Sequence, residues 1–265
     1  MPTVNKTLHK IGAAKFISTF DAKSGYRQIP VAKKDRWLTA FVTHDALYEW
    51  VRMPFGLENA GATFVIAVRM VLHPIRDFSK SYVDDVGVRS TCWSDYLSHL
   101  RQFLSVICNN DMTLNLAKCN FAKPEVKFVG HFIGSGTRKP DPQRLEGITN
   151  MSRPRTKSEL RKLLGAFSYY REYVPHFAEI SKTLTDFTSK QTPNVLPWTD
   201  EHQYALECLR TKLSSPHVLR IPQFGKPFCL HTDAIGIAVG TTLGQLDDEG
   251  FEQPLAFAGQ KLTGP

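Results

Sequence analysis

The order of apolar patterns along the first half of the chain constrains its fold most strongly. Residues 15–20 are rich in aromatic and β-branched side chains and precede Asp21, which predicts a strand. Apolar residues recur at helical spacing over 59–75, with Asn59 available as an N-cap. Residues 81–88 place two aspartates between β-forming residues, so we expect a hairpin with Asp84 and Asp85 at its tip.

A second helix and a further strand continue this pattern. Ser94 is the expected cap of the helix, and its apolar stripe comprises Leu97, Leu100, Leu104 and Ile107. A strand at 113–116 follows. The order β, α, β, β, α, β is the split βαβ pattern, which predicts an α+β fold with a ferredoxin-like core. Strands at 39–43 and 47–51 form an expected hairpin inserted after the first strand.

The second half of the chain has a different texture. Beyond residue 137 it becomes basic and helical, and Thr156 to Glu159 match a capping box before an apolar helical stripe. Pro193 and Pro197 mark another boundary, after which Thr199 begins a helix and new strands follow at 228–232 and 238–243. We therefore expect domains at 1–137, 138–192 and 193–265.

The charge balance favours a polyanionic partner. The chain carries 33 Lys and Arg against 25 Asp and Glu, a net charge of +8. Residues 138–171 contain nine Lys and Arg against three Asp and Glu, so most of this surplus lies there. Such a concentration suits phosphate contacts along a nucleic-acid duplex, although a solvated helix face would have the same composition.

The cysteine spacing and the hydropathy of the chain predict the compartment in which the protein resides. The five cysteines form no C-x-x-C pair and no zinc-binding spacing, which is typical of reduced, intracellular thiols. No apolar run approaches the roughly 18 residues that a membrane helix needs, and no signal peptide is present. We expect a soluble, unsecreted cytoplasmic protein without membrane contact, and both ends resemble cuts through a longer protein.

The topology predicts that three distant carboxylates meet. In a βαβ unit the helix returns the chain, so the first and second strands are parallel and finish at one edge of the sheet. Asp21 ends the first strand, while Asp84 and Asp85 lie in the turn that ends the second. Three adjacent negative charges repel one another unless cations bind them, and oxygen ligands favour Mg²⁺ or Mn²⁺. The alternative is that Asp84 and Asp85 form an ordinary solvated turn.

Two such ions, about 3.5–4 Å apart, would favour one class of chemistry. They can activate an attacking hydroxyl, stabilise an in-line phosphoryl transition state and neutralise the leaving oxygen. The sequence thus predicts nucleotidyl transfer at this edge of the sheet.

Several short motifs resemble those of Ty3/gypsy-type retrotransposon reverse transcriptases, in the family's order and over nearly the whole chain. They are FDAKSGYRQIP at 20–30, MPFGL at 53–57, YVDD at 82–85, NLAKC at 115–119, FVGH at 128–131, LGAFSYYR at 164–171 and TDA at 232–234. The resemblance implies a right-hand polymerase palm with partial fingers, a helical thumb and the start of a ribonuclease H-like domain.

The resemblance assigns roles around the nucleotide. Asp21, Asp84 and Asp85 match the ligands of two catalytic metal ions. Tyr26 matches an aromatic gate that excludes a ribose 2'-hydroxyl, although a core tyrosine is the alternative. The remaining nucleotide-binding positions that it implies are Ala22, Pro54, Phe55 and Gly56.

Further matches concern the primer and template. Lys118 resembles a lysine that protonates departing pyrophosphate, whereas a lysine at a strand end is more often merely solvated. The implied primer and template contacts are Tyr82, Val83, Phe128, Val129, Gly130, His131, Lys157, Arg161 and Lys162. Asp233 matches the first metal-binding acid of the ribonuclease H site, whose other acids do not follow, so we expect no complete hybrid-cleaving centre.

The sequence also departs from the family pattern. Gly61 stands where proline is usual, Val65 replaces a glutamine near the nucleotide, and Gly259-Gln260 replaces Ser-Arg. The family's fingers normally precede the first palm strand, and this chain begins too late to contain them. We therefore expect the 265 residues to polymerise poorly by themselves.

The function expected from these observations is RNA- and DNA-templated DNA synthesis with two Mg²⁺ ions. Its expected partners are a template–primer duplex, deoxynucleoside triphosphates and the remaining pol polyprotein domains, in the cytoplasm or a virus-like particle. One alternative is a catalytically silent retroelement remnant that only binds nucleic acid or a partner. Another is a metal-dependent nuclease that uses the same acids.

Overall fold

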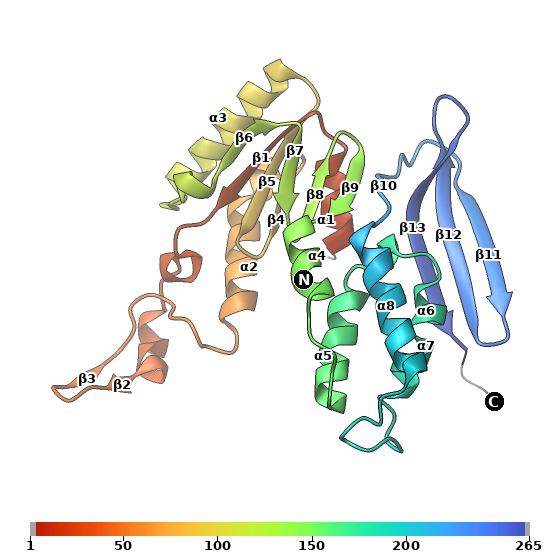
Figure 1. Ribbon diagram of the computed structural model, residues 1–265. Helices are drawn as coiled ribbons and strands as arrows, with labels where there is room; N and C mark the ends of the chain where they lie inside the picture. The colour runs from red at the N-terminus through yellow and green to blue at the C-terminus, as the bar shows by residue number, and fades with distance from the viewer. Residues whose placement is uncertain (1–3, 263–265) are drawn as a thin grey trace. The chain divides into compact units, whose positions relative to one another are not determined.

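The computed structural model describes residues 4–262, and the chain divides into two compact units (Figure 1). The first unit comprises residues 1–129 and 133–136, and the second comprises 130–132 and 137–265. No helix among residues 4–262 has the length and hydropathy to cross a membrane. The chain-end residues on which we based the expectation of a longer protein lie largely outside the described part.

A four-stranded sheet forms the centre of the first unit. Its order is β4 (Ser79–Tyr82), β5 (Asp85–Ser90), β1 (Phe16–Asp21) and β6 (Asn120–Lys123). Because β5 is antiparallel to both β4 and β1, these two strands run in the same direction, with β5 between them. The expected split βαβ topology of an α+β fold is confirmed.

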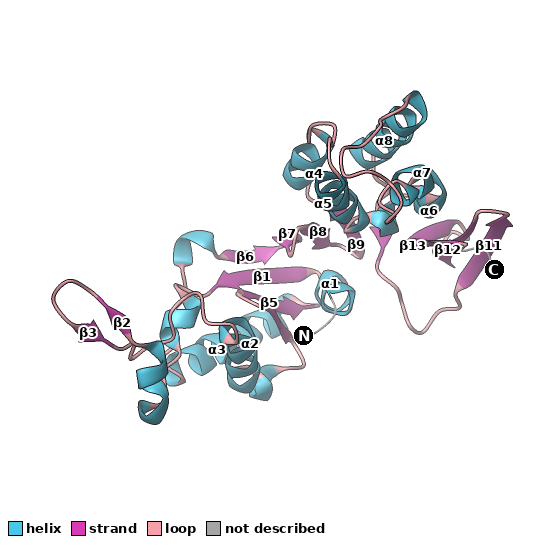
Figure 2. Ribbon diagram, turned by 90° about the horizontal axis from the view of Figure 1, so that it is seen from below, coloured by secondary structure: helices cyan, strands magenta, loops and turns pink. Residues whose placement is uncertain are grey.

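Two helices cover one side of this sheet, as Figure 2 shows: α2 (Ala60–Val71) and α3 (Trp93–Asn109). Phe64 and Phe103 are fully buried among the apolar side chains of β1 and β5. Phe20 stacks on Phe103 with 4.2 Å between ring centroids. A second cluster joins α1 (Val4–Gly12) to the sheet through Leu8, Ile11 and Ile17, so both ends of β1 are anchored by packing.

The predicted stripe of α3 is correct in part, because Ile107 is buried and Leu100 packs against the core. Leu97 and Leu104 are 40% and 42% exposed, whereas Tyr96, Phe103 and Ile107 are buried. Leu97, Leu100 and Leu104 recur at helical spacing as regularly as the aromatic residues do. The bulkier rings of Tyr96 and Phe103 nevertheless face the sheet. The helix begins one residue after Cys92, so the expected cap Ser94 lies inside its first turn.

The predicted strand at 113–116 is also wrong. Only one bridge forms there, between Ala22 and Leu114, and the 3-10 helix η4 (Leu116–Lys118) follows at once. The strand that pairs with β1 is β6, which begins at Asn120.

The inserted hairpin is shorter than expected and lies away from the core. It consists of β2 (Phe41–Val42) and β3 (Leu47–Tyr48), between which Thr43 N–H donates to the Ala46 carbonyl at 2.9 Å. Val42 and Leu47 are 79% and 66% exposed. The other 3-10 helices of this unit are η1 (Gly25–Gln28), η2 (Lys33–Thr39) and η3 (His73–Ile75), and β7 (Glu125–Phe128) follows β6.

Helices dominate the centre of the second unit. They are α4 (Pro142–Thr149), α5 (Lys157–Ser168), η5 (Arg171–Tyr173), α6 (Phe177–Ile180), α7 (Lys182–Asp186) and α8 (Asp200–Ser214). The Thr156 side chain accepts from Glu159 N–H, which confirms the predicted cap of α5. Leu160, Leu163 and Phe167 are buried, as the sequence pattern predicted.

The second unit also contains strands at both ends of its sequence. β9 (Thr137–Pro140) pairs with β10 (Leu219–Arg220), and β8 (His131–Gly134) precedes them at the division between the units. An antiparallel meander follows, made of β11 (Cys229–Ile235), β12 (Ala238–Leu246) and β13 (Glu252–Lys261). The two strands expected beyond residue 225 are confirmed, and β13 is an addition to them.

Candidate active site

The sheet brings the predicted acids to one edge. Asp21 is the last residue of β1 and lies directly opposite Asp85, the first residue of β5. Residues opposite each other on antiparallel strands carry their side chains on the same face. Asp84 precedes Asp85 in the two-residue turn after β4, so the three acids are neighbours although more than sixty positions separate them in sequence.

The turn that carries Asp84 has a strained backbone. Val83 adopts a φ of +52°, a left-handed conformation that β-branched residues rarely occupy. Such a conformation costs about 1–3 kcal/mol and persists only where the surrounding structure enforces it. Here the pairing of Tyr82 with Asp85 closes the hairpin around Val83 and Asp84. Strain of this kind is common at functional sites.

The local electrostatics reflect crowded negative charge. Partial burial and the nearby Asp21 carboxylate raise the pKa of Asp84, while Lys118 opposes this effect. Lys118 Nζ lies 3.5 Å from Asp21 Oδ2. The backbone explains this proximity, because Asn115 N–H donates to the Asp21 carbonyl at 2.9 Å and η4 then turns Lys118 toward the acids.

The acids do not form a ready-made metal cage. Within residues 4–262, no three His, Cys, Asp or Glu side chains are grouped closely enough to hold an ion by themselves. The donor chemistry nevertheless fits Mg²⁺, which typically uses one or two carboxylates together with substrate phosphates. The raised pKa of Asp84 also indicates that a cation beside Asp21 and Asp84 would relieve repulsion.

The predicted nucleotide-binding residues lie close together. Tyr26 packs against Phe55 and Phe64, with ring centroids 5.2 and 5.3 Å apart. Phe55 is 64% exposed, whereas Pro54 and Ala22 are buried. Gly56 has a φ of +93°, so glycine suits this turn. A Cβ added at Gly25 would lie 3.4 Å from Asp84 Oδ1, which places the Tyr26 segment beside the acids.

Gln28 is a residue of this site that sequence reasoning missed. Its Nε2 donates to the carbonyls of Lys23 and Thr113 at 2.7 and 2.9 Å, and its Oε1 accepts from Thr113 N–H at 2.9 Å. A single side chain thereby ties the Tyr26 segment to residues 113–115. The only sequence signal was its place within the FDAKSGYRQIP motif.

The predicted primer segment contains two left-handed residues in succession. Val129 and Gly130 have φ values of +47° and +73°, between buried Phe128 and buried His131. The Gly130 carbonyl accepts from Tyr170 Oη at 3.0 Å and from Asp141 N–H at 3.1 Å. Sequence reasoning assigned no role to Tyr170.

Two of the three predicted thumb cations already have partners. Lys157 Nζ donates to the carbonyls of Ser189 and Thr192, and Arg161 Nη2 donates to the Thr188 carbonyl at 2.9 Å. Lys162 is exposed on the same helix. A role in holding the loop at 188–192 thus accompanies any phosphate contact of Lys157 and Arg161.

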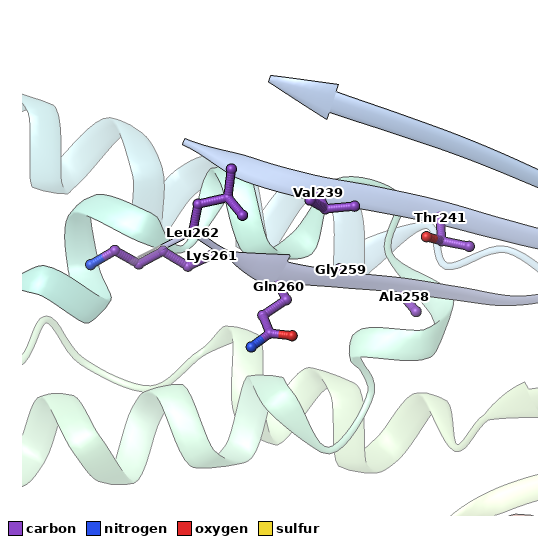
Figure 3. A pocket seen from close by; sticks show the side chains of 7 residues that line it. All are labelled: Val239, Thr241, Ala258, Gly259, Gln260, Lys261 and Leu262. Carbon is purple, nitrogen blue, oxygen red and sulfur yellow. The ribbon is translucent and has the colours of Figure 1, made fainter. Parts of the chain in front are cut away.

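Asp233 lies in β11, opposite Gly240 of β12. A pocket of about 510 Å³ lies nearby on the same sheet, lined by Val239, Thr241, Ala258, Gly259, Gln260, Lys261 and Leu262 (Figure 3). No carboxylate lines it. A second pocket, of about 780 Å³, lies between α1, α2 and β4 and also contains none of the predicted site residues.

Comparison with known proteins decides the family. The profile of the family described as "Reverse transcriptase (RNA-dependent DNA polymerase)" matches residues 1–133, and that of the "RNase H-like domain found in reverse transcriptase" matches 198–265. The chain belongs to the reverse transcriptase family.

Relatives of the chain include Pol polyproteins of Ty3/gypsy-type retrotransposons. The chain is 34% identical to the retrovirus-related Pol polyproteins from transposons opus and gypsy of Drosophila melanogaster. These alignments cover 99% and 100% of the chain but only 27% and 26% of the relatives. A Tf2 transposon polyprotein of Schizosaccharomyces pombe is 29% identical over 99% of the chain and 20% of its own length. The chain thus spans about a quarter of such polyproteins.

Solved structures agree with this assignment. A foamy viral protease–reverse transcriptase in complex with double-stranded DNA has a TM-score of 0.89 and 27% identity, over 99% of this chain and 46% of that one. The foamy viral enzyme in complex with an RNA/DNA hybrid has a TM-score of 0.83 and 28% identity, over 98% of this chain and 35% of that one. The reverse transcriptase fold expected from the sequence motifs is therefore confirmed.

Proposed function

We propose that this chain is the polymerase portion of a retrotransposon Pol polyprotein and adds deoxynucleotides to a primer 3'-hydroxyl on RNA and DNA templates. The observation that supports this most is the meeting of Asp21, Asp84 and Asp85 at one edge of the palm sheet, with Asp84 in a strained turn. Family membership supports the same chemistry, and the structural relatives are complexes with double-stranded DNA and with an RNA/DNA hybrid.

In this proposal the three aspartates hold two Mg²⁺ ions, or Mn²⁺ in their place. The bound ions would lower the pKa of the primer hydroxyl and stabilise charge on the transferring phosphoryl group. The carboxylates supply hard oxygen ligands, and the nucleotide phosphates complete the coordination. Lys118, whose Nζ lies 3.5 Å from Asp21 Oδ2, would donate a proton to a pyrophosphate leaving beside these acids.

The residues around Tyr26 select the nucleotide. The ring of Tyr26, fixed by its contacts with Phe55 and Phe64, would clash with the 2'-hydroxyl of a ribonucleotide. Pro54, Phe55 and Gly56 form the surface beneath the incoming deoxynucleoside triphosphate. Gln28 keeps this segment in place through its three hydrogen bonds.

Primer extension tests the proposal. We expect the chain to extend oligo(dT) on poly(rA) weakly with Mg²⁺, and Asp84→Asn to abolish extension. Asp95→Asn, which removes an exposed carboxylate from the first turn of α3, should leave extension unchanged. Equal extension by the wild-type chain and Asp84→Asn would refute the assigned site.

A second candidate function is that of a silent remnant that only binds nucleic acid. It is supported by the absence of a three-ligand metal group among residues 4–262 and by the positive charge of 138–171. No extension by the wild-type chain, combined with salt-sensitive duplex binding, would favour the remnant. Cleavage without incorporation would indicate a nuclease instead.

A further inference from the structure

The segment that follows α5 holds Gly130 and His131 from within the second unit. Tyr170 is 1% exposed, and its hydroxyl donates to the Gly130 carbonyl at 3.0 Å. Asp141 N–H donates to the same carbonyl at 3.1 Å. Because a carbonyl oxygen has two lone pairs, both acceptor positions of Gly130 are used, and the peptide plane between residues 130 and 131 is fixed.

His131 is fixed in a similar way by Tyr173. A hydrogen bond of 2.9 Å joins His131 Nδ1 to Tyr173 Oη, and both side chains are at least 97% buried. Burial and the neighbouring Arg138 lower the pKa of His131 to about 4, so its ring is neutral near pH 7. Burial raises the pKa of Tyr170 to about 12 and also raises that of Tyr173, so both hydroxyls keep their protons.

Arg138 forms a second layer behind Tyr173. Its guanidinium lies 5.4 Å from the centre of the Tyr173 ring, and Nη1 lies 2.9 Å from Glu172 Oε2. Nη2 donates to the Leu255 carbonyl of β13 at 2.9 Å. The Tyr173 ring is consequently packed against a guanidinium that is itself held by an ion pair with Glu172 and a hydrogen bond to Leu255.

The hydrogen bonds of Tyr170 and Tyr173 converge on the segment 128–131. Phe128, Val129, Gly130 and His131 are the residues to which we assigned contact with the primer end, and two of them have left-handed backbones. A segment in this conformation needs external hydrogen bonds to keep one geometry. The two tyrosine hydroxyls supply them at the buried residues Gly130 and His131, which follow the half-buried Val129.

We propose that Tyr170 and Tyr173 are positioning residues: by fixing Gly130 and His131, they hold the segment 128–131 in one geometry for contact with the primer 3'-end. This inference rests on the proposed polymerase function and goes beyond it, since neither tyrosine touches the primer in this account. Each acts through the residue to which its hydroxyl is bonded.

The experiment compares the full chain with Tyr170→Phe and Tyr173→Phe, which remove one hydroxyl each and keep the ring. Tyr204→Phe, at a 73% exposed position on α8, is the matched control. Two quantities are measured for each protein. The first is amide hydrogen exchange of residues 129–132 without nucleic acid, and the second is the ratio of affinities for a recessed-end duplex and a blunt duplex of equal length.

We expect faster exchange at residues 129–132 in both variants and a preference for the recessed end reduced by about 3- to 10-fold, the factor expected for one hydrogen bond. Affinity for the blunt duplex and the thermal midpoint of Tyr170→Phe should stay close to wild type. Tyr204→Phe should match the wild-type chain in every measurement.

The outcomes separate the two proposals. Wild-type preference for the recessed end that persists in both variants would overturn the positioning role, even if exchange becomes faster. A wild-type chain without any such preference would instead contradict the proposed primer contact of residues 128–131. Reduced preference together with reduced blunt-duplex affinity and a lowered midpoint would show general damage, and would also overturn the role.

Discussion

Asp21 and Asp85 lie directly opposite each other on adjacent antiparallel strands, with Asp84 next to them in a strained turn. This register brings the end of β1 and the start of β5, which are distant in sequence, together at one edge of the sheet. It also implies that the metal-free protein keeps like charges together at a cost in stability.

Asp84→Asn should therefore raise the thermal midpoint of the metal-free chain slightly, because the partial burial of a charge and the repulsion from Asp21, which together raise the pKa of Asp84, are both removed. In the wild-type chain, added Mg²⁺ should raise the midpoint by binding the folded state, and this increase should be absent in the variant. Differential scanning fluorimetry with EDTA and with Mg²⁺ measures both effects. Asp95→Asn should respond to Mg²⁺ as the wild-type chain does; a full Mg²⁺ response in Asp84→Asn would contradict the site.

Gly134→Ala should destabilise the first unit by about 3 kcal/mol or more, the cost of a steric collision that backbone atoms cannot relieve. A Cβ at this position would lie 2.0 Å from the Pro124 carbonyl oxygen. Gly136→Ala is the matched control, since its φ of +73° is also left-handed but nothing lies within 4 Å of the added carbon. It should cost only about 1 kcal/mol. Urea unfolding gives both values, and equal losses would mean that conformation alone matters.

His131→Asn should change how stability depends on pH. The pKa of His131 falls from 6.5 to about 4 on folding. Between these two pH values the unfolded chain is protonated at His131 and the folded chain is not. Stability should thus fall as pH drops from 6.5 toward 4, by up to about 1.4 kcal/mol per pH unit from this group. The variant should lose that part of the slope. His44→Asn, whose side chain is 90% exposed, should keep the wild-type slope; a parallel decline in all three proteins would exclude His131 as the cause.

Lys162→Gln and Lys157→Gln should affect duplex binding differently. Lys162 is exposed, so its removal should lower the salt dependence of binding by about one phosphate contact and leave stability unchanged. Lys157 donates to two carbonyls of the loop at 188–192, so its removal should lower the unfolding midpoint as well. Fluorescence anisotropy over a range of salt concentrations and thermal unfolding distinguish them. Identical salt slopes for the wild-type chain and Lys162→Gln would argue against a thumb contact at this position.

Local sequence patterns were sufficient for the topology of the palm. Strand and helix periodicities predicted the order of elements as far as α3, and the parallel direction of the two strands of a βαβ unit then predicted that Asp21 lies beside Asp84 and Asp85. The same patterns failed where two solutions were equally regular. On α3, leucines and aromatic residues both recur at helical spacing, and only the space above β1 selects Tyr96 and Phe103.

The long-range hydrogen bonds that fix the site residues could not be predicted from the sequence, for a different reason. Gln28 binds Thr113, and Tyr170 binds Gly130, across 85 and 40 positions respectively. A glutamine or tyrosine in a motif does not indicate which distant carbonyl it will reach, because that depends on the completed fold. Arg138 was predicted only as one of several basic thumb residues, yet it is buried and paired with Glu172.

The position of β5 between β4 and β1 has a consequence for biosynthesis. The hairpin bearing Asp84 and Asp85 can close as soon as Ser90 has left the ribosome, but it can meet Asp21 only by capturing a strand made some sixty residues earlier. Long-range pairing of this kind is slow compared with hairpin closure. In a nascent chain Asp84 and Asp85 should consequently be fixed in their hairpin before Asp21 comes to lie opposite Asp85.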